Sequence, residues 1–446
     1  MPRQLRLNAF IHDIGHHEAA WRLPESDPLA TTDVDHYINV ARIAENAGFD
    51  SIFFADNVNL LGDPQYRPVG ILEPTTLLAA LAVSTSRIGL IATASTSYSE
   101  PFDLARRFSS LDHISRGRIG WNIVTSAGDA AARNFGRDAQ ALHRDRYARA
   151  EDFLAAVTAL WDSWADDARV ADKDTGVFAD SGRIRAVNHH GPYFDVAGPL
   201  NIPRAPQGYP LLVQAGSSLD GREFAARWAE AVFTAQRTLA EGREFYADLK
   251  ARTVAAGRPA GDIVILPGVV PFLGSTEAEA RAREQEFEER IVPAYGLHQL
   301  STFFGVDFSD VDLDGPLPEV PAEDDIEGFK SRSTLVAELA RRENLTVRQL
   351  IGKLGGGRGH RSVTGTPEQL ADDLQTWFTT GAADGFNIMP PALPGDLTTF
   401  VDHVLPILRR RGLLRDGYEG ATLREHYGLA RPGDRFEVSG LAAAHG

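Results

Sequence analysis

The most informative stretch of this 446-residue chain reads Gly117-Arg118-Ile119-Gly120-Trp121-Asn122-Ile123-Val124-Thr125-Ser126. Its apolar part, Ile119 to Val124, predicts a short buried β-strand. The stretch ends in Asn, Thr and Ser side chains, which bring hydrogen-bond donors and acceptors to the end of that strand. Enzymes with parallel sheets bind their ligands at the carboxyl ends of the strands. The stretch therefore predicts a parallel strand and a ligand site at its end.

Seven other apolar runs have the same character. Together the eight predicted strands are Leu5 to Phe10, Ser51 to Ala55, Ile88 to Ala92, Ile119 to Val124, Leu211 to Ala215, Ala231 to Thr234, Ile263 to Leu266 and Gly385 to Met389. Segments with a 3.6-residue apolar period predict helices at 33–46, 74–84, 101–115, 139–164, 220–229, 239–256, from 277, 367–378 and 397–411. Buried strands that alternate with helices form parallel sheets covered on both faces. The expected fold is α/β, a (β/α)8 TIM barrel, and an open doubly wound sheet is the alternative.

Two stretches between these elements are longer than ordinary connections. They cover about 166–210 and about 293–364, and we expect both to be insertions into a single domain of residues 1–446. The second contains the glycine-rich run Gly355 to Gly359. Because long connections inside compact domains are commonly functional, we expect this one to be a mobile lid beside the barrel mouth.

Composition excludes several classes of protein. No apolar run approaches the roughly 18 residues of a membrane span, and the first residues lead into a strand, so we expect a cytoplasmic protein. The chain has no cysteine, which excludes disulfides and thiolate chemistry. Its formal charge of −16 argues against nucleic acid or a membrane surface as a partner. His189 and His190 have no third ligand at a recognisable spacing, so we expect no metal site.

Polar side chains follow the predicted strands. Asp56 follows the second, Thr93 the third and Asn122 the fourth. The fifth is followed by Gln214-Ala215-Gly216-Ser217-Ser218 and then by a helix. Glycine allows close approach of the backbone, the hydroxyls donate, and a helix N-terminus favours an anion such as phosphate. The alternative is that Ser217 and Ser218 only cap the helix.

His143 and Tyr147 lie four residues apart on a predicted helix, so they share one face. If that face meets the serine turn, an imidazole and a phenol join the two hydroxyls around a phosphate. A single histidine on a helix is more often structural, so spacing alone does not decide between these interpretations.

The order of residues in 117–126, with Asn134-Phe135-Gly136 after it, closely resembles the signature segment of a family of two-component flavin monooxygenases. These luciferase-like enzymes act on nitrilotriacetate, dibenzothiophene sulfone or long-chain alkanes. The resemblance extends from Gly15–Arg22 through Asp384–Pro391 to Tyr418–Gly420. It implies FMN as cofactor, with His143, Tyr147, Ser217 and Ser218 around the phosphate and Asp56 and Thr93 near the ring.

The resemblance also implies the reaction. A separate NAD(P)H:flavin reductase would supply FMNH2, which reacts with O2 to a peroxyflavin that oxygenates a carbon, nitrogen or sulfur centre of a small organic substrate. The chain has no Gly-x-Gly-x-x-Gly after a strand for a nicotinamide nucleotide of its own, which agrees with an external reductase. Such enzymes are expected to be homo-oligomers, dimers or tetramers.

Four residues are candidates for catalysis. His16 or His17, after the first strand, would handle protons, because histidine exchanges them near neutral pH. Asn122 would hydrogen-bond the flavin ring or the peroxide, and His360 is a further candidate. Ordinary loop polarity is the alternative for the histidines. Two other functions stay open: a deazaflavin-dependent dehydrogenase of the same superfamily, and a non-catalytic flavin-binding protein.

Overall fold

The computed structural model describes residues 3–60, 63–70, 72–126, 128–320, 330–357 and 359–433. Eight parallel strands form a closed barrel, in which the last strand pairs with the first. Around the barrel they are β1 (Arg6–Ile11), β2 (Ser51–Phe54), β3 (Gly89–Ser95), β4 (Ile119–Val124), β9 (Leu211–Gln214), β10 (Ala231–Thr234), β11 (Val264–Leu273) and β13 (Gly385–Ile388). The predicted (β/α)8 barrel is confirmed, and each predicted strand is present.

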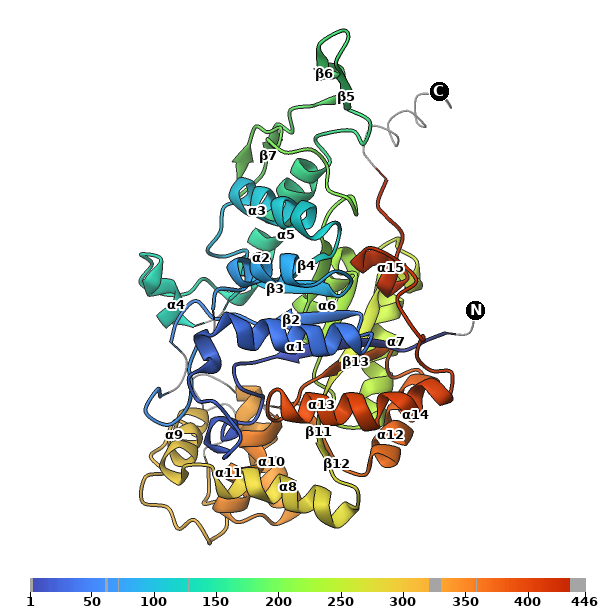
Figure 1. Ribbon diagram of the computed structural model, residues 1–446. Coiled ribbons are helices and arrows are strands. Elements are labelled where there is room, and N and C mark those ends of the chain that lie inside the picture. The colour runs from blue at the N-terminus through green and yellow to red at the C-terminus, as the bar shows by residue number, and fades with distance from the viewer. Residues whose placement is uncertain are drawn as a thin grey trace.

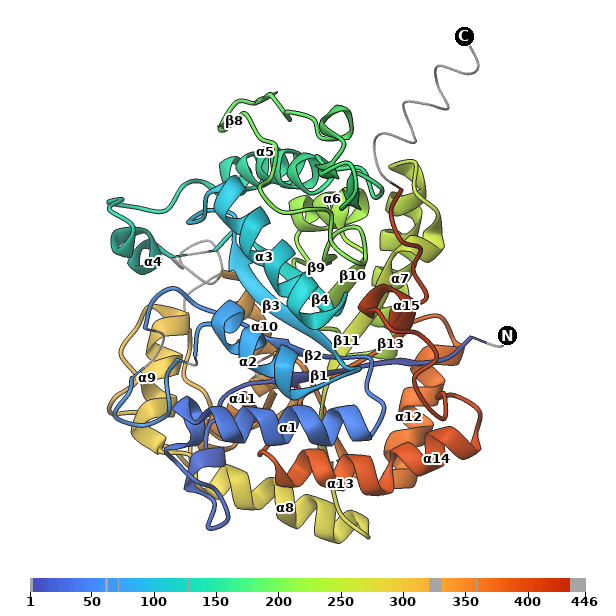
Figure 2. The same ribbon diagram turned by 45° about the horizontal axis from the view of Figure 1, so that its top comes forward.

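Helices surround this barrel (Figures 1 and 2). They are α1 (Val34–Asn46), α2 (Pro74–Ser84), α3 (Pro101–Ser115), α5 (His143–Trp161), α6 (Leu219–Trp228), α7 (Leu239–Ala255), α12 (Pro367–Thr379), α13 (Gly395–His403) and α14 (Leu405–Arg410). Side chains at several helix starts accept hydrogen bonds from the first free N–H groups, as Asp33 does from Asp35. The predicted helix 397–411 is divided in two at Val404, shortly before Pro406, because proline has no N–H for the helical ladder.

The alternation of side chains along β4 separates the core from the site. Trp121 is fully buried on the outer face, where it packs against Phe108 of α3 and Phe153 of α5. Gly120 faces the barrel interior, because a Cβ there would lie 2.9 Å from Ile91 in the interior cluster. Since successive side chains on a strand point to opposite faces, Asn122 also faces inward.

The C-terminal segment closes one end of the barrel. Helix α15 (Leu423–Tyr427) inserts Leu423 and Tyr427 into the interior cluster, and the Tyr427 hydroxyl lies 2.7 Å from that of Ser51. A Cβ at Gly89 would lie 2.2 Å from Leu423, so glycine makes room for this side chain. Figures 1 and 2 both show α15 beside the N-terminus, on the side away from helices α4 (Asp129–Asn134) and α9 (Pro293–Phe304). The carboxyl ends of the strands are therefore at the other end.

The first insertion projects from the barrel wall (Figure 1). It contains the hairpins β5 (Arg169–Asp172) with β6 (Val177–Ala179) and β7 (His189–His190) with β8 (Asp195–Val196). Asp152 of α5 holds the second hairpin: its carboxylate bonds His189 at 2.7 Å and accepts from the backbone N–H groups of Tyr193 and Phe194.

The second insertion is largely helical, where the sequence suggested a flexible glycine-rich stretch. It follows α8 (Glu277–Glu289) and contains α9, α10 (Lys330–Glu343), α11 (Val347–Gly357) and β12 (Arg361–Gly365), which pairs with β11 outside the barrel. A Cβ at Gly296 would lie 2.2 Å from Ile351, and one at Gly355 would lie 2.6 Å from Ile291. These glycines allow close packing within the insertion, so they do not indicate flexibility. Within the described residues no helix is both long and apolar enough to cross a lipid bilayer.

Candidate active site

Asn122 and Thr93 lie side by side inside the open end of the barrel, in register on β4 and β3. The Asn122 amide donates to the Thr93 hydroxyl at 2.8 Å, and that hydroxyl donates to the Phe54 carbonyl at 2.9 Å. Thr93 thereby fixes the orientation of the Asn122 amide. The Asn122 Oδ1 atom is buried and has no hydrogen-bond partner in the described part of the chain. A buried acceptor without a hydrogen bond destabilises the folded protein unless a ligand supplies the donor.

The turn after β9 separates the two serines. Ser218 is the N-cap of α6, and its hydroxyl accepts from the Gly221 N–H at 3.1 Å. Ser217 precedes the cap and its side chain is exposed. Capping therefore accounts for Ser218 and leaves Ser217 available to a ligand.

His143 and Tyr147 lie in the first two turns of α5, beside this turn. The His143 Nδ1 atom is 2.8 Å from a carboxylate oxygen of Asp220, in the first turn of α6. The Tyr147 hydroxyl lies close to the backbone of Gly216 and Gly221. A Cβ added at Gly216 would be 2.7 Å from this hydroxyl, and one added at Gly221 would be 3.0 Å from it. Burial raises the pKa of Tyr147, and a hydrogen bond with Ser218 lowers it by less. The phenol therefore keeps its proton at neutral pH. The structure thus brings these two side chains to the serine turn.

Gln214 belongs to the same arrangement, and the sequence did not identify it as a site residue. It ends β9, is 3% exposed, and its Oε1 atom has no partner among the described residues. A Cβ at Gly216 would lie 2.3 Å from the Gln214 amide nitrogen, so the glycine accommodates this side chain. The available signal was a polar residue at the end of an apolar strand, as for Asn122.

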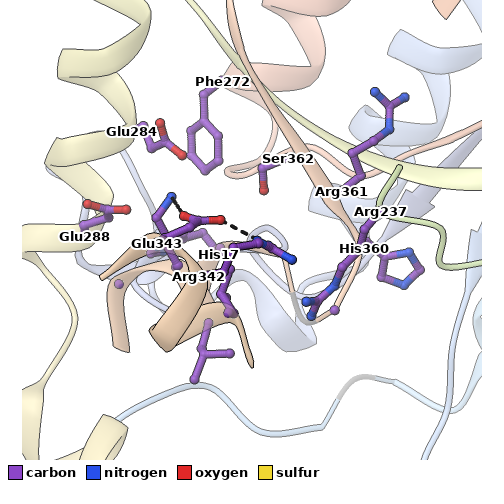
Figure 3. A pocket seen from close by; sticks show the side chains of 16 residues that line it. His17, Arg237, Phe272, Glu284, Glu288, Arg342, Glu343, His360, Arg361 and Ser362 are labelled. Carbon is purple, nitrogen blue, oxygen red and sulfur yellow. Dashed lines mark hydrogen bonds and ion pairs between the residues drawn. The ribbon is translucent and has the colours of Figure 1, made fainter. Parts of the chain in front are cut away.

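The predicted catalytic histidines are not all in one place. His16 is 1% exposed, and its Nε2 atom lies 3.0 Å from the Phe10 carbonyl. His17 accepts from the Ala19 N–H at Nδ1 and lines a cavity of about 220 Å³. His360 lines the same cavity (Figure 3). The structure therefore groups His17 with His360 and places His16 against the barrel wall.

A larger cavity, of about 660 Å³, lies between the barrel mouth and the second insertion. Asp56 lines it from the end of β2, and burial raises the pKa of this carboxyl. The Glu18 carboxylate bonds Arg67 at 3.3 Å and the Gln299 amide of α9 at 2.8 Å, which connects the insertion to the barrel. The volume is in the range of small-molecule sites.

The comparisons with known proteins identify the family. The model of the luciferase-like monooxygenases matches residues 15–384 of this chain. The chain belongs to this family. The expected resemblance is confirmed, and the protein is an enzyme, an oxidoreductase.

Relatives extend the match over nearly the whole chain. This chain is 47% identical over 435 residues to N-acetyl-S-(2-succino)cysteine monooxygenase of Bacillus subtilis (strain 168). The match covers 97% of this chain and 98% of the relative. It is 48% identical over 443 residues to nitrilotriacetate monooxygenase component A of Aminobacter aminovorans, with 96% and 97% covered. A solved structure of riboflavin lyase with a modified FMN and riboflavin is 34% identical, with a TM-score of 0.83, and 97% and 98% of the two chains covered.

We expect the second insertion to open and close over the larger cavity. Its helices share a hydrophobic cluster distinct from the main barrel core. The loop after β1 connects the two through Ala19, which joins this cluster, and through polar groups around Glu18. Elements with few contacts to the main core open locally at low cost. Amide hydrogen exchange in α9 and α11 should therefore slow when FMN is added, while α1 on the barrel flank stays unchanged. Equal exchange in α9 and α11 with and without FMN would contradict a lid.

Proposed function

We propose that this protein is an FMN-dependent monooxygenase that uses FMNH2 and O2 to oxygenate a carbon, nitrogen or sulfur centre of a small organic substrate. The observation that carries this proposal is the meeting of His143 and Tyr147 with the N-terminus of α6, next to the carboxyl end of β9. A helix N-terminus, the exposed Ser217 and the protonated Tyr147 phenol all favour a phosphate group.

The residues present fit FMN at this end of the barrel. Ser217, Tyr147 and His143 would hold the phosphate, and Gly216 lets its backbone approach closely. Asn122, whose Oδ1 atom is a buried acceptor without a partner in the described residues, would accept from a ring N–H. Bound FMNH2 would supply the electrons that activate O2.

Other residues would act around the reacting atoms. Asp56 would lie near the ring from the end of β2, and Thr93 would keep the Asn122 amide in place. His17 or His360 would move protons from the smaller cavity, since both line it. The helices of the second insertion would exclude water from the reduced flavin.

FMNH2 would come from a separate NAD(P)H:flavin reductase. The relative from Aminobacter aminovorans is named component A, which supports a second protein in the system. Reduced nicotinamide is a cytoplasmic reductant, so we propose that the protein works in the cytoplasm. We also propose that it is a homo-oligomer.

A substrate panel tests this function. The protein would be supplied with FMN, NADH, O2 and a general flavin reductase, and products would be scored by the gain of one oxygen atom. Oxygenated product that requires both flavin and protein supports the proposal. If no compound gains oxygen and a reduced deazaflavin transfers hydride to an acceptor, the protein is a dehydrogenase instead. Flavin binding without either reaction would indicate a binding protein.

We expect the protein to bind reduced FMN more tightly than reduced FAD. The single phosphate of FMN is largely a dianion at neutral pH and would contact Ser217, Tyr147 and His143 at the N-terminus of α6, whereas each bridging phosphate of FAD carries only one charge. A preference of about tenfold or more corresponds to ~1.4 kcal/mol. Anaerobic titration of both flavins measures it, with riboflavin as the reference that lacks phosphate. Equal affinity for the two nucleotides would contradict a site that recognises a terminal phosphate.

A further inference from the structure

Arg237 is the arginine that lines both cavities at the open end of the barrel. It follows β10, and Figure 3 shows it toward one side of the smaller cavity, with Glu284, Glu288 and Glu343 toward the other. Leu354 and Gly359 also line both cavities, so the two spaces meet in this region. Arg237 therefore lies where a molecule in the larger cavity would extend toward the smaller one.

The other cations of these cavities already have partners. Arg67 pairs with Glu18 at 3.3 Å, and Glu343 pairs with both Arg342 at 3.2 Å and Lys353 at 3.3 Å. Arg361 pairs with Asp373. Among the lysines and arginines that line the cavities in the described chain, only Arg237 has no carboxylate at ion-pair distance.

The backbone around Arg237 is fixed although its guanidinium is not paired. Glu241 at the start of α7 accepts from the backbone N–H groups of Arg237 and Thr238, so its carboxylate is already used. The preceding Gln236 is buried and donates to the Thr234 hydroxyl at 3.0 Å. Arg237 is partly buried and its backbone is fixed. Its side chain therefore loses little conformational entropy when it binds a ligand.

Two carboxylates that line the larger cavity already bond other groups. Asp13 bonds His12 at 2.8 Å, and Glu18 bonds Arg67 and Gln299. Arginine is always charged and presents parallel N–H donors that match a carboxylate in two-point contact. An anionic group on a substrate would therefore find one prepared partner at this position.

We propose that Arg237 binds a carboxylate of the substrate, and that the substrate class is therefore small organic carboxylates. The inference rests on the proposed function for its reaction. In this arrangement the carboxylate anchors one end of the molecule at Arg237, and the rest of the molecule reaches into the 660 Å³ cavity lined by Asp56. Arg237 is then the residue that selects substrates by charge.

Equilibrium binding to the FMN-loaded full chain tests the proposal without turnover. The probes are nitrilotriacetate, N-acetyl-S-(2-succino)cysteine, and the uncharged triamide of nitrilotriacetate. The wild type should bind at least one carboxylate probe and bind the triamide much more weakly. Arg237→Gln should lose about 10- to 100-fold in affinity for the carboxylate probe, as expected for a lost hydrogen bond to a charged group. Arg237→Lys should lose less, because it keeps the charge and loses the two-point contact.

Arg342→Gln is the matched control, because Arg342 lines the smaller cavity but already pairs with Glu343. It should bind the carboxylate probes as the wild type does, and FMN affinity should be the same in all variants. The proposal is overturned if Arg237→Gln binds the probes normally, if it loses FMN affinity instead, or if the wild type binds neither carboxylate. Carboxylate binding that depends on Arg237 without oxygenated product would refute the proposed function alone. Oxygenation of uncharged dimethyl sulfide without carboxylate binding would refute this inference alone.

Discussion

A Ser217→Asp variant should lose FMN affinity by about ten- to hundredfold and keep its fold. Ser217 precedes the N-cap of α6 and is exposed, so replacing it removes no capping bond. If a phosphate binds here, the new carboxylate faces it at contact distance and also removes a hydroxyl donor. The lost charge-assisted hydrogen bond alone costs about 1.5–3 kcal/mol, which gives the expected loss. Titration of FMN measures it, and thermal unfolding of the apo protein checks the fold.

Ser217→Asn is the control for this variant, because asparagine has nearly the same shape as aspartate and no charge. It should lose much less affinity than Ser217→Asp. The helix dipole gives a competing expectation, since aspartate near a helix N-terminus stabilises the free protein. Unchanged FMN affinity in a folded Ser217→Asp variant would show that the turn after β9 binds no phosphate.

A Gly15→Ala variant should lose about 2–5 kcal/mol of unfolding free energy, from ~1–2 kcal/mol of backbone strain and ~1–3 kcal/mol of overpacking. Gly15 has a φ of +149°, and an added Cβ would lie 2.1 Å from the Pro391 carbonyl oxygen. The loop after β1 is held to the segment after β13, where the His17 N–H donates to that same carbonyl. The displaced loop would move His16 and His17, so oxygenation should fall as well. Urea unfolding and product formation measure the two effects.

Gly257→Ala separates strain from overlap. Gly257 also has a positive φ, of +82°, but an added Cβ there would meet no atom within 4 Å. This variant should lose only the strain, about 1–2 kcal/mol, and should keep its activity. Equal stability losses in the two variants would show that the loop after β1 adapts to the extra carbon.

The barrel could be predicted because its strands are continuous apolar runs, which is how strands buried on both faces appear in a sequence. Strand ends also indicated where Asn122 and the serine turn lie, because polar side chains interrupt those runs. The helices of the second insertion were missed for a physical reason. Their apolar residues cover a small separate cluster, and glycines such as Gly296 resembled loop residues although they permit close helix packing.

Other parts of the site depend on contacts that a sequence does not contain. Ser217 and Ser218 are adjacent and chemically equal, and only the geometry of α6 shows which one caps it. His16 and His17 differ in the same way, since His17 lines the cavity of about 220 Å³ and His16 contacts the Phe10 carbonyl. Arg237 resembles any surface arginine, and its place became visible once the partners of the other cavity cations were known.

The helix that closes the amino-terminal end of the barrel has a consequence for synthesis. Leu423 and Tyr427 fill the interior between β2, β3 and β4, although they come some 300 or more residues later in the chain. Chains emerge from the ribosome from the N-terminus onward, and contacts between distant residues must wait for both partners. A nascent chain therefore exposes an incomplete interior until α15 has been translated. A message truncated shortly before codon 423 would yield a barrel with an open base, and hence a target for proteases.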